Sequence, residues 1–238
     1  MLANIPIENI LFLDIETVPQ APGFGNLPDE MKKLWELKAK NIKKDDESEE
    51  QAYRHAGKYA EFGKIICIGA GYISGTKANR LMRIKAVGGD DESKVLSEFS
   101  DMVKKFFSGG DKYLCAHNGK EFDFPFLARR MLVNGIPLPP ALDMAGKKPW
   151  EVQHLDTMEL WKFGDFKAYT SLNLLAAIFK IPTPKDDIDG SMVYEVYWKQ
   201  KDMERIVRYC RKDVLTVAQL LLRFKGESLL DDKNVEMI

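Results

Sequence analysis

Two acidic side chains, Asp14 and Glu16, follow four large apolar residues in the stretch ILFLDIETVP, residues 10–19. Four such residues in a row are typical of a strand that is covered on both faces. Because successive side chains of a strand point to opposite faces, Asp14 and Glu16 share one face, in or beside the core. Buried carboxylates are costly unless a cation pairs with them, so the pattern indicates either a cation site or a strand end that reaches solvent.

Two further acids and a tyrosine could join this pair. Residues from about 202 to 224 carry apolar side chains at helical spacing; Asp213 falls on or beside that stripe, and Tyr209 lies one turn earlier. Asp123 stands at the start of another predicted helix. Each has an ordinary explanation, since Asp123 is a good N-cap and Asp213 could belong to a buried ion pair. Their conjunction with the first two acids favours a chemical role.

The elements that would position these residues follow from hydrophobic periodicity and from Gly and Pro punctuation. After the first strand, buried strands are predicted at 64–73, 81–89 and 112–118, with a weaker one at 151–160. Helices are predicted at 91–107, 122–135, 171–180 and 202–224, with a loop at 182–191. Three strands in a row, then strands alternating with helices, predict an α/β domain: a mixed sheet of about five strands flanked by helices.

The whole chain, 1–238, is expected to form a single domain with a charged insertion at about 26–60, between the first two strands. The insertion should begin as a helix and continue as a solvated loop through KKDDESEE, residues 43–50. The alternative is that it forms a flap over a site.

Composition narrows the classes of function. Lys and Arg total 35 against 36 for Asp and Glu, so no global basic field exists and a nucleic-acid partner must be recognised at a local site. Three scattered cysteines without metal-ligand spacing favour a reducing, cytoplasmic setting. The N-terminus has no signal-peptide pattern and no apolar run approaches about 18 residues, so neither secretion nor a membrane partner is expected.

Three ordered motifs resemble one known family. FLDIET at 12–17 is similar to a first motif, Asp-x-Glu on the first strand; HNGKEFDFPFL at 117–127 is similar to a second; YCRKD at 209–213 is similar to a third, Tyr-x-x-x-Asp. Together they resemble the DEDDy branch of the DnaQ-like 3′→5′ exonucleases, and within it the stand-alone proteins related to the exonuclease domain of family B DNA polymerases. The histidine branch places His five residues before the last Asp, where this chain has Arg208.

The resemblance implies a ribonuclease H-like fold and metal-dependent hydrolysis at the 3′ end of single-stranded DNA, releasing nucleoside 5′-monophosphates. It implies two Mg²⁺ or Mn²⁺ ions held by Asp14, Glu16, Asp123 and Asp213, with Asp14 bridging both, and such hard cations prefer carboxylate oxygens. Tyr209 completes the catalytic set by orienting the attacking water. A phenol of pKa about 10 is too little ionised at pH 7 to act as the base.

By the same resemblance, Thr17, Asn118 and Phe122 should lie against the terminal nucleotides. The ring of Phe122 either stacks on a base or packs under the start of a helix. Four lysines could contact phosphates: Lys147, Lys148, Lys162 and Lys167. Isolated surface lysines, however, are usually only solvated.

Three residues near the motifs are expected to have supporting roles. Asp156 should be a strand-end acid or one that supports the site from behind. His117 and His154 should be packing or hydrogen-bonding residues and not metal ligands.

Two other functions stay open. One is an exoribonuclease of the same mechanism, because no residue in the sequence can be identified as a contact to the 2′-hydroxyl that distinguishes RNA from DNA. The other is a catalytically inactive, nucleic-acid-binding accessory module, which the complete set of acids disfavours. A polymerase or repair partner acting in trans is compatible with either, and the charged stretch from about 29 to 59 carries no motif of the family.

Overall fold

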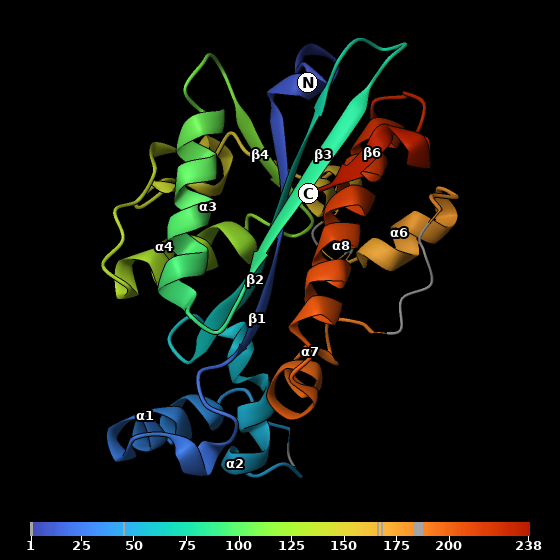
Figure 1. The fold of residues 1–238 in the computed structure, drawn as a ribbon. Helices are drawn as coiled ribbons and strands as arrows, with labels where there is room; N and C mark the ends of the chain where they lie inside the picture. The colour runs from blue at the N-terminus through green and yellow to red at the C-terminus, as the bar shows by residue number, and fades with distance from the viewer. Residues whose placement is uncertain (1, 45, 166, 168, 183–187) are drawn as a thin grey trace.

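A mixed β-sheet forms the centre of the protein. The computed structural model describes residues 2–44, 46–165, 167, 169–182 and 188–238. Within these residues the sheet has six strands in the order β5-β4-β1-β2-β3-β6 (Figure 1). The strands are β1 (Ile10–Pro19), β2 (Gly63–Ser74), β3 (Leu81–Gly88), β4 (Tyr113–Ala116), β5 (Leu155–Asp156) and β6 (Val235–Met237).

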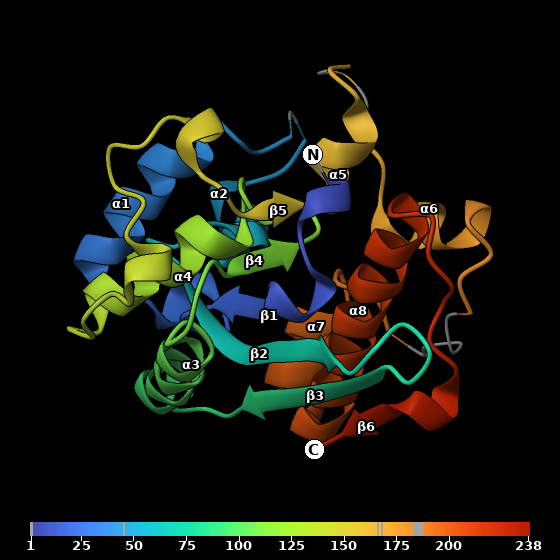
Figure 2. The same ribbon diagram turned by 90° about the horizontal axis from the view of Figure 1, so that it is seen from above.

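The three long strands pair antiparallel, β1 with β2 and β2 with β3. The short strands pair parallel, β4 with β1, β5 with β4, and β6 with β3. Figure 2 shows the six side by side in that order. The expected α/β fold with a mixed sheet is confirmed, and β6 is one strand more than the sequence predicted.

Helices cover both faces of the sheet. The α-helices of the described residues are α1 (Asp29–Ala39), α2 (Glu49–Ala52), α3 (Glu92–Phe106), α4 (Asp123–Val133), α5 (Thr157–Lys162), α6 (Leu172–Ile178), α7 (Val193–Glu195) and α8 (Met203–Phe224). One face carries α3 and α4, and the other carries α6 and α8 (Figure 1). No helix in the described part of the chain is both long and apolar enough to cross a membrane.

The alternation of β1 decides which face the acids occupy. Leu11 and Leu13 pack in the core beneath α3 and α4, whereas Phe12 packs in the core beneath α8. Asp14 and Glu16 continue the series of Phe12, because side chains two residues apart share a face. The two acids therefore lie on the same side of the sheet as α8.

A glycine brings α8 close to the sheet at this point. Gly69 on β2 is the register partner of Asp14. A Cβ at Gly69 would lie 2.8 Å from Cγ2 of Val214 and 2.9 Å from Sγ of Cys210, both on α8. Only glycine permits so close an approach, so Gly69 lets α8 lie directly against the strand pair that carries the acids.

The strand predicted at 151–160 is much shorter in the structure. It forms only at Leu155–Asp156, and the chain then continues as α5. The side chain of Asp156 accepts hydrogen bonds from the N–H groups of Met158 and Glu159, which caps a helix where the sequence predicted more strand. The loop expected at 182–191 lies in part outside the described residues.

The segment 20–62, between β1 and β2, has a small core of its own. Trp35 is fully buried at its centre, and its Nε1 donates to the Glu49 carbonyl at 2.8 Å. The other buried members of this cluster are Leu27, Ala39, Ala52, Tyr53, Ala56 and Phe62. The solvated loop expected at 43–50 is shorter than predicted, because a capping box between Ser48 and Gln51 starts α2.

One buried ion pair joins this segment to the rest of the fold. Nη2 of Arg130 on α4 lies 2.6 Å from Oε2 of Glu92 on α3. Glu92 also accepts the N–H of Ile65 on β2, and Arg130 donates to the carbonyl of Ala60. Four separate parts of the chain therefore meet at a single charge pair that water barely reaches.

Candidate active site

A cleft of about 650 Å³ brings together the four acids and the tyrosine singled out in the sequence. Asp14 and Glu16 come from β1, Asp123 from the first turn of α4, and Tyr209 and Asp213 from α8. β4 pairs with β1 only as far as Phe12, so the strands part just before the acids. Crevices at the carboxyl ends of parallel strands are common ligand sites, and the loop leading to α4 enters the cleft there.

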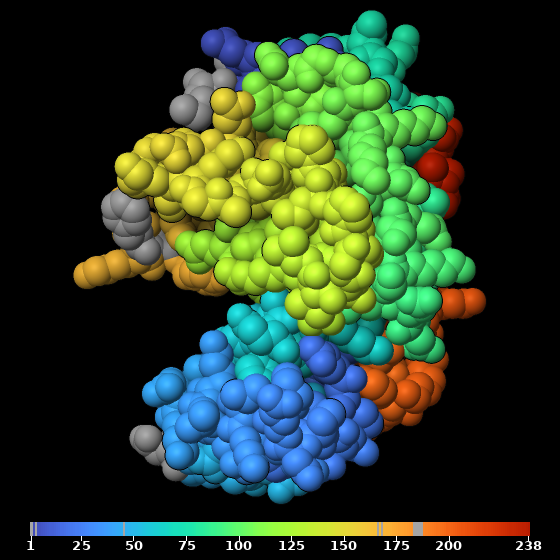
Figure 3. All heavy atoms as spheres, turned by 90° about the vertical axis from the view of Figure 1, so that its left-hand side faces the viewer, coloured from blue at the N-terminus to red at the C-terminus, as the bar shows by residue number. Residues whose placement is uncertain are grey.

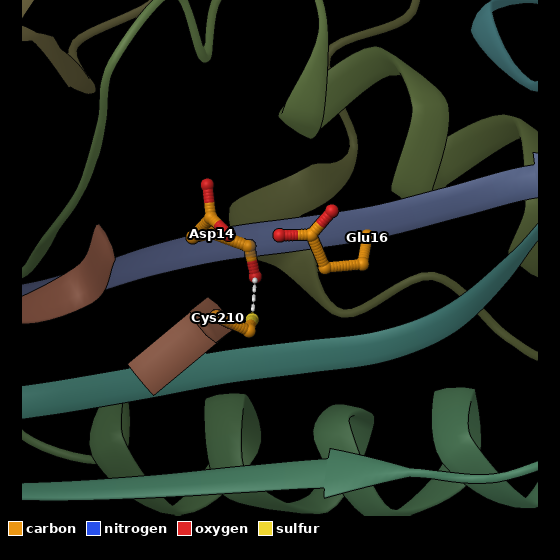
Figure 4. Close-up of side chains that lie close together, drawn as sticks. All are labelled: Asp14, Glu16 and Cys210. Atoms are coloured by element: carbon orange, nitrogen blue, oxygen red, sulfur yellow. Dashed lines mark hydrogen bonds between the residues drawn. The ribbon is translucent and has the colours of Figure 1, made fainter. Parts of the chain in front are cut away.

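The carboxylates are crowded and shielded from water. Glu16 is 7% exposed and Asp123 is 4% exposed. Figure 4 shows Asp14 and Glu16 on one strand, with Cys210 of α8 beside them. One potential ligand atom from each of these three residues lies within 4.8 Å of the others, a grouping that could hold a metal ion. The Sγ of Cys210 itself donates to the backbone oxygen of Asp14 at 3.5 Å.

Burial and mutual repulsion weaken the acidity of this group. Burial, followed by the charge of Glu16, raises the pKa of Asp14 well above its ordinary value. Burial, followed by the charge of Asp213, does the same to the pKa of Glu16. Burial also raises the pKa of Asp123 to about 8. Without a counter-charge, all three carboxyl groups ionise less readily than usual, and Asp123 keeps its proton at neutral pH.

These residues fit a divalent metal ion. Oδ2 of Asp14 is buried, and no described residue donates a hydrogen bond to it. Within the described part of the chain, no Lys or Arg forms an ion pair with Asp14, Glu16 or Asp123. Asp14, Glu16 and Asp123, with one unsatisfied buried oxygen and no basic partner among the described residues, suit a hard cation that prefers oxygen ligands.

Tyr209 is held as a neutral hydrogen-bond donor. Burial, followed by the charge of Asp213, raises the pKa of its hydroxyl above the ordinary value of 10.0. A hydrogen bond links its side chain to that of Asp213, one helical turn later. The phenol therefore keeps its proton at neutral pH, which agrees with a role in orienting a water and not in removing a proton.

The three expected substrate contacts do not all reach this cleft. Thr17 and Phe122 line it. The Thr17 hydroxyl donates to the carbonyl of Gly57 at 2.8 Å, and the Phe122 ring also packs against Phe126, with centroids 5.3 Å apart. Asn118 lines a separate neighbouring cavity, where its side-chain amide donates to the hydroxyl of Tyr169 at 2.7 Å. None of the four lysines considered for phosphate contact lines the cleft.

Asp156 organises the loop that leads to Asp123. Its carboxylate accepts the backbone N–H groups of Asn118 and Lys120, in addition to capping α5. These bonds fix the turn after β4, in which Asn118 takes a positive φ of 62°. Asp156 therefore supports the loop that carries Asp123 without lining the cleft, as expected. The sequence did not indicate which two backbone N–H groups it would bind.

The two histidines make the hydrogen bonds expected of supporting residues. His117 lines the cleft; its Nδ1 lies 2.9 Å from the Thr157 hydroxyl and its Nε2 lies 2.9 Å from the Thr170 carbonyl. His154 accepts the N–H of Leu114 through Nδ1, and its Nε2 lies 2.6 Å from the Ala141 carbonyl. Both rings are engaged on both nitrogens and are therefore poor metal ligands.

Sequence reasoning missed the residues of the remaining walls. The segment 20–62 contributes Arg54, His55, Gly57 and Lys58 to the lining. The turn before α7, α7 itself and the segment Val196–Gln200 contribute Gly190, Ser191, Tyr194, Glu195 and Lys199. No motif marks the residues of the segment 20–62. The one available signal was the placement of a long charged segment directly after the strand that carries the acids.

Comparisons with known proteins give one family and one fold. A family model described as "Predicted 3'-5' exonuclease related to the exonuclease domain of PolB" matches residues 59–234. That range includes Asp123, Tyr209 and Asp213 but not β1. The comparison with curated proteins gave no match.

Among solved structures, the chain resembles that of the family B DNA polymerase from the hyperthermophilic archaeon Pyrobaculum calidifontis. The TM-score is 0.51 and the sequence identity is 19%. The similarity covers 92% of this chain but 25% of the polymerase chain. At this identity the likeness concerns the fold.

Proposed function

We propose that this chain, which belongs to the family of predicted 3′→5′ exonucleases related to the exonuclease domain of PolB, hydrolyses phosphodiester bonds at the 3′ end of single-stranded DNA. The products would be nucleoside 5′-monophosphates. One observation carries the proposal: four carboxylates and a protonated tyrosine from β1, α4 and α8 converge on one cleft.

Two Mg²⁺ or Mn²⁺ ions would be held by Asp14, Glu16, Asp123 and Asp213. When bound, such ions lower the pKa of an attacking water and neutralise charge on the reacting oxygens. Because the pKa of Asp123 is about 8 and the pKa values of Asp14 and Glu16 are also raised, the free site binds protons more tightly than exposed carboxylates do. Binding of cations would release those protons, so the affinity of the site for metal should rise with pH.

The chain's own side chains would align the reaction. Tyr209 donates from its hydroxyl and would hold the attacking water in line with the scissile bond. Phe122 and the backbone after Glu16 line the cleft beside the acids and would bind the last nucleotide. None of these contacts reads a base edge, so the reaction should tolerate any sequence.

The proposal predicts that digestion starts at a 3′ terminus and stops when EDTA is added. The measurement uses oligonucleotides labelled at the 5′ or the 3′ end, as DNA and as RNA, with Mg²⁺, Mn²⁺ or EDTA. A circular single strand is the matched control, because it has the same chemistry and no end. Cutting of the circle, or full activity in EDTA, would contradict the proposal. Faster digestion of RNA would identify an exoribonuclease, and binding without cleavage by the metal-loaded protein would identify an inactive accessory module.

Tyr209→Phe should reduce kcat about 10- to 1000-fold and leave KM nearly unchanged. The change removes one hydroxyl and keeps the ring in place, so it affects positioning of water more than binding of the strand. Tyr113→Phe, on β4 outside the cleft, is the matched control and should have wild-type kinetics. Wild-type turnover by Tyr209→Phe would assign Tyr209 a structural role.

A further inference from the structure

The cleft has a basic wall as well as an acidic one. Arg54, His55 and Lys58 line it from the segment 20–62, and Lys199 lines it from the short π-helix Val196–Gln200 that follows α7. Figure 3 shows the surface hollowed between the lobe of the segment 20–62, in blue, and the part of the chain in yellow. One cleft therefore places positive side chains near the proposed metal ligands.

The basic wall is fixed to the strand that carries the acids. Gly57, between Arg54 and Lys58, accepts the hydrogen bond of the Thr17 hydroxyl. A Cβ at Gly57 would lie 3.0 Å from the backbone carbon of Val18, so this turn rests on the backbone of β1. Arg54 and Lys58 are thus held at a set position relative to Asp14 and Glu16 and do not swing on a loose flap.

The other side of the cleft is tied to the same strand. Nε1 of Trp198 donates to the carbonyl of Pro19 at 3.2 Å. The hydroxyl of Tyr194 donates to the carbonyl of Pro22 at 2.5 Å. Lys199, next to Trp198, is therefore positioned by the end of β1, just as Arg54 and Lys58 are.

These basic groups retain capacity for a ligand. Nη2 of Arg54 lies 3.0 Å from Oε1 of Glu47, and its Nε donates to Nε2 of His55 at 3.1 Å, yet 61% of the Arg54 side chain stays exposed. Lys58 is exposed and forms no ion pair with any residue that the structure describes. Lys199 lies 3.4 Å from Glu195 in an exposed pair, which is weak in water.

His55 supports Arg54 as a neutral ring. Burial, followed by the charges of Arg54 and Lys58, lowers the pKa of His55 below its ordinary value of 6.5. Its Nε2 can therefore accept the Arg54 N–H at neutral pH, which holds the guanidinium at the rim of the cleft.

We infer that Arg54, Lys58 and Lys199 bind the backbone phosphates of the nucleotides that precede the terminal one. This rests on the proposed function, which places the scissile phosphate at the four acids. A single strand carries one charge per nucleotide, and the protein has a net charge of −1, so the following phosphates need local cations. The segment 20–62 thus makes the enzyme favour strands of several nucleotides over dinucleotides, without reading their sequence.

The test compares the full-length Arg54→Ala/Lys58→Ala variant with wild type. The matched control is Lys33→Ala/Lys40→Ala, which removes two exposed charges of the same segment outside the cleft. Binding of a fluorescent single-stranded oligonucleotide is measured in EDTA across a salt series. The Arg54/Lys58 variant should bind about 10-fold more weakly, and its salt slope should fall by about 0.7 per lost contact. The control should match wild type.

Activity separates this inference from the proposed function. The Arg54/Lys58 variant should have a raised KM on the long strand and unchanged rates on a dinucleotide, because a dinucleotide lacks the preceding phosphates. Lys199→Ala, which leaves the segment 20–62 intact, should reduce the salt slope in the same way. Unchanged affinity and slope in these variants would overturn the inference while leaving the exonuclease assignment intact. An inactive wild type whose binding depends on these residues would overturn the proposed function and not the phosphate contacts.

Discussion

Asp14→Asn should abolish nuclease activity, by at least about 10²- to 10³-fold, and yet stabilise the metal-free protein. Asparagine keeps the shape of the side chain but cannot ionise, so it removes a group whose charged form is opposed by burial and by the neighbouring carboxylates. Oδ2 of Asp14 is buried and has no hydrogen-bond partner among the described residues. An asparagine amide at that position can donate a hydrogen bond to a neighbouring carboxylate. The gain should be about 1 to 3 kcal/mol, with a Tm increase of about 2–4 °C per kcal/mol.

The pH dependence of stability gives the sign of this effect. The carboxyl of Asp123 has a pKa of about 8 in the folded protein against an ordinary value of 3.8. The folded state thus binds a proton that the unfolded state has released, and stability must fall as pH rises between those two values. The metal-free wild type should therefore melt at a lower temperature near pH 8 than near pH 5. Asp14→Asn should flatten that slope, because one source of repulsion is gone.

Thermal melts with and without metal check both statements. Mg²⁺ or Mn²⁺ should raise the Tm of wild type more than that of Asp14→Asn, since a ligand stabilises only as far as it binds the folded state. Asp111→Asn, at an exposed position outside the cleft, is the matched control and should change neither activity nor Tm. A large loss of metal-free stability in Asp14→Asn would show that its carboxylate has a cationic partner in the fold.

Arg130→Met should destabilise the protein by about 3–5 kcal/mol. The substitution leaves the Glu92 carboxylate buried without its cation and the Ala60 carbonyl without its donor. For a chain of this size the loss corresponds to about 2–4 °C in Tm per kcal/mol. Urea unfolding and thermal melts measure it directly.

A double variant separates the unpaired charge from lost packing. In Glu92→Gln/Arg130→Met, the glutamine oxygen can still accept the N–H of Ile65, and no buried charge remains. The double variant should therefore recover much of the stability that Arg130→Met loses. The stability losses of Glu92→Gln alone and Arg130→Met alone are then compared with the loss in the double variant. If the two single losses add up to the loss in the double variant, Glu92 and Arg130 make no net contribution as a pair.

The architecture was predictable where one signal ran along a whole element. The apolar run of β1 and its alternation indicated that Asp14 and Glu16 share a face, and the amphipathic pattern of residues 202–224 gave α8 almost in full. The resemblance carried by three motifs is confirmed by the family match. The roles of the individual acids and of Tyr209 remain predictions.

The misses occurred where a single contact, local or distant, determined the structure of a short stretch. The residues after Asp156 read as strand, but the capping bonds of that carboxylate turn them into α5. β6 has three residues and exists only because it pairs with β3. Asn118 of the second motif has a positive φ, bonds to Tyr169 and lines the neighbouring cavity, and its contact with a substrate stays a prediction.

The segment 20–62 was the largest gap in the sequence reading. Its charge run predicted a solvated surface, and the charged residues do lie mainly outside. Trp35 and its apolar neighbours are spaced too irregularly to indicate a core, because the helices that bring them together are short. The contribution of Arg54 and Lys58 to the cleft depends on the contact of Gly57 with β1, which no local pattern records.

The segment 20–62 leaves and rejoins the sheet at adjacent positions, so its length has little effect on the stability of the strand pair it connects. The N–H of Gln20 bonds to the carbonyl of Phe62, and Pro19 pairs with Gly63, so the whole excursion closes on adjacent ladder positions. The entropy lost on closing a flexible loop grows only with the logarithm of its length, about 0.6 kcal/mol for each doubling. A hairpin connection of this length therefore costs little more to close than a moderately long one. The cluster around Trp35 offsets part of that cost, so the sheet can accommodate a second small core at this connection with little loss of stability.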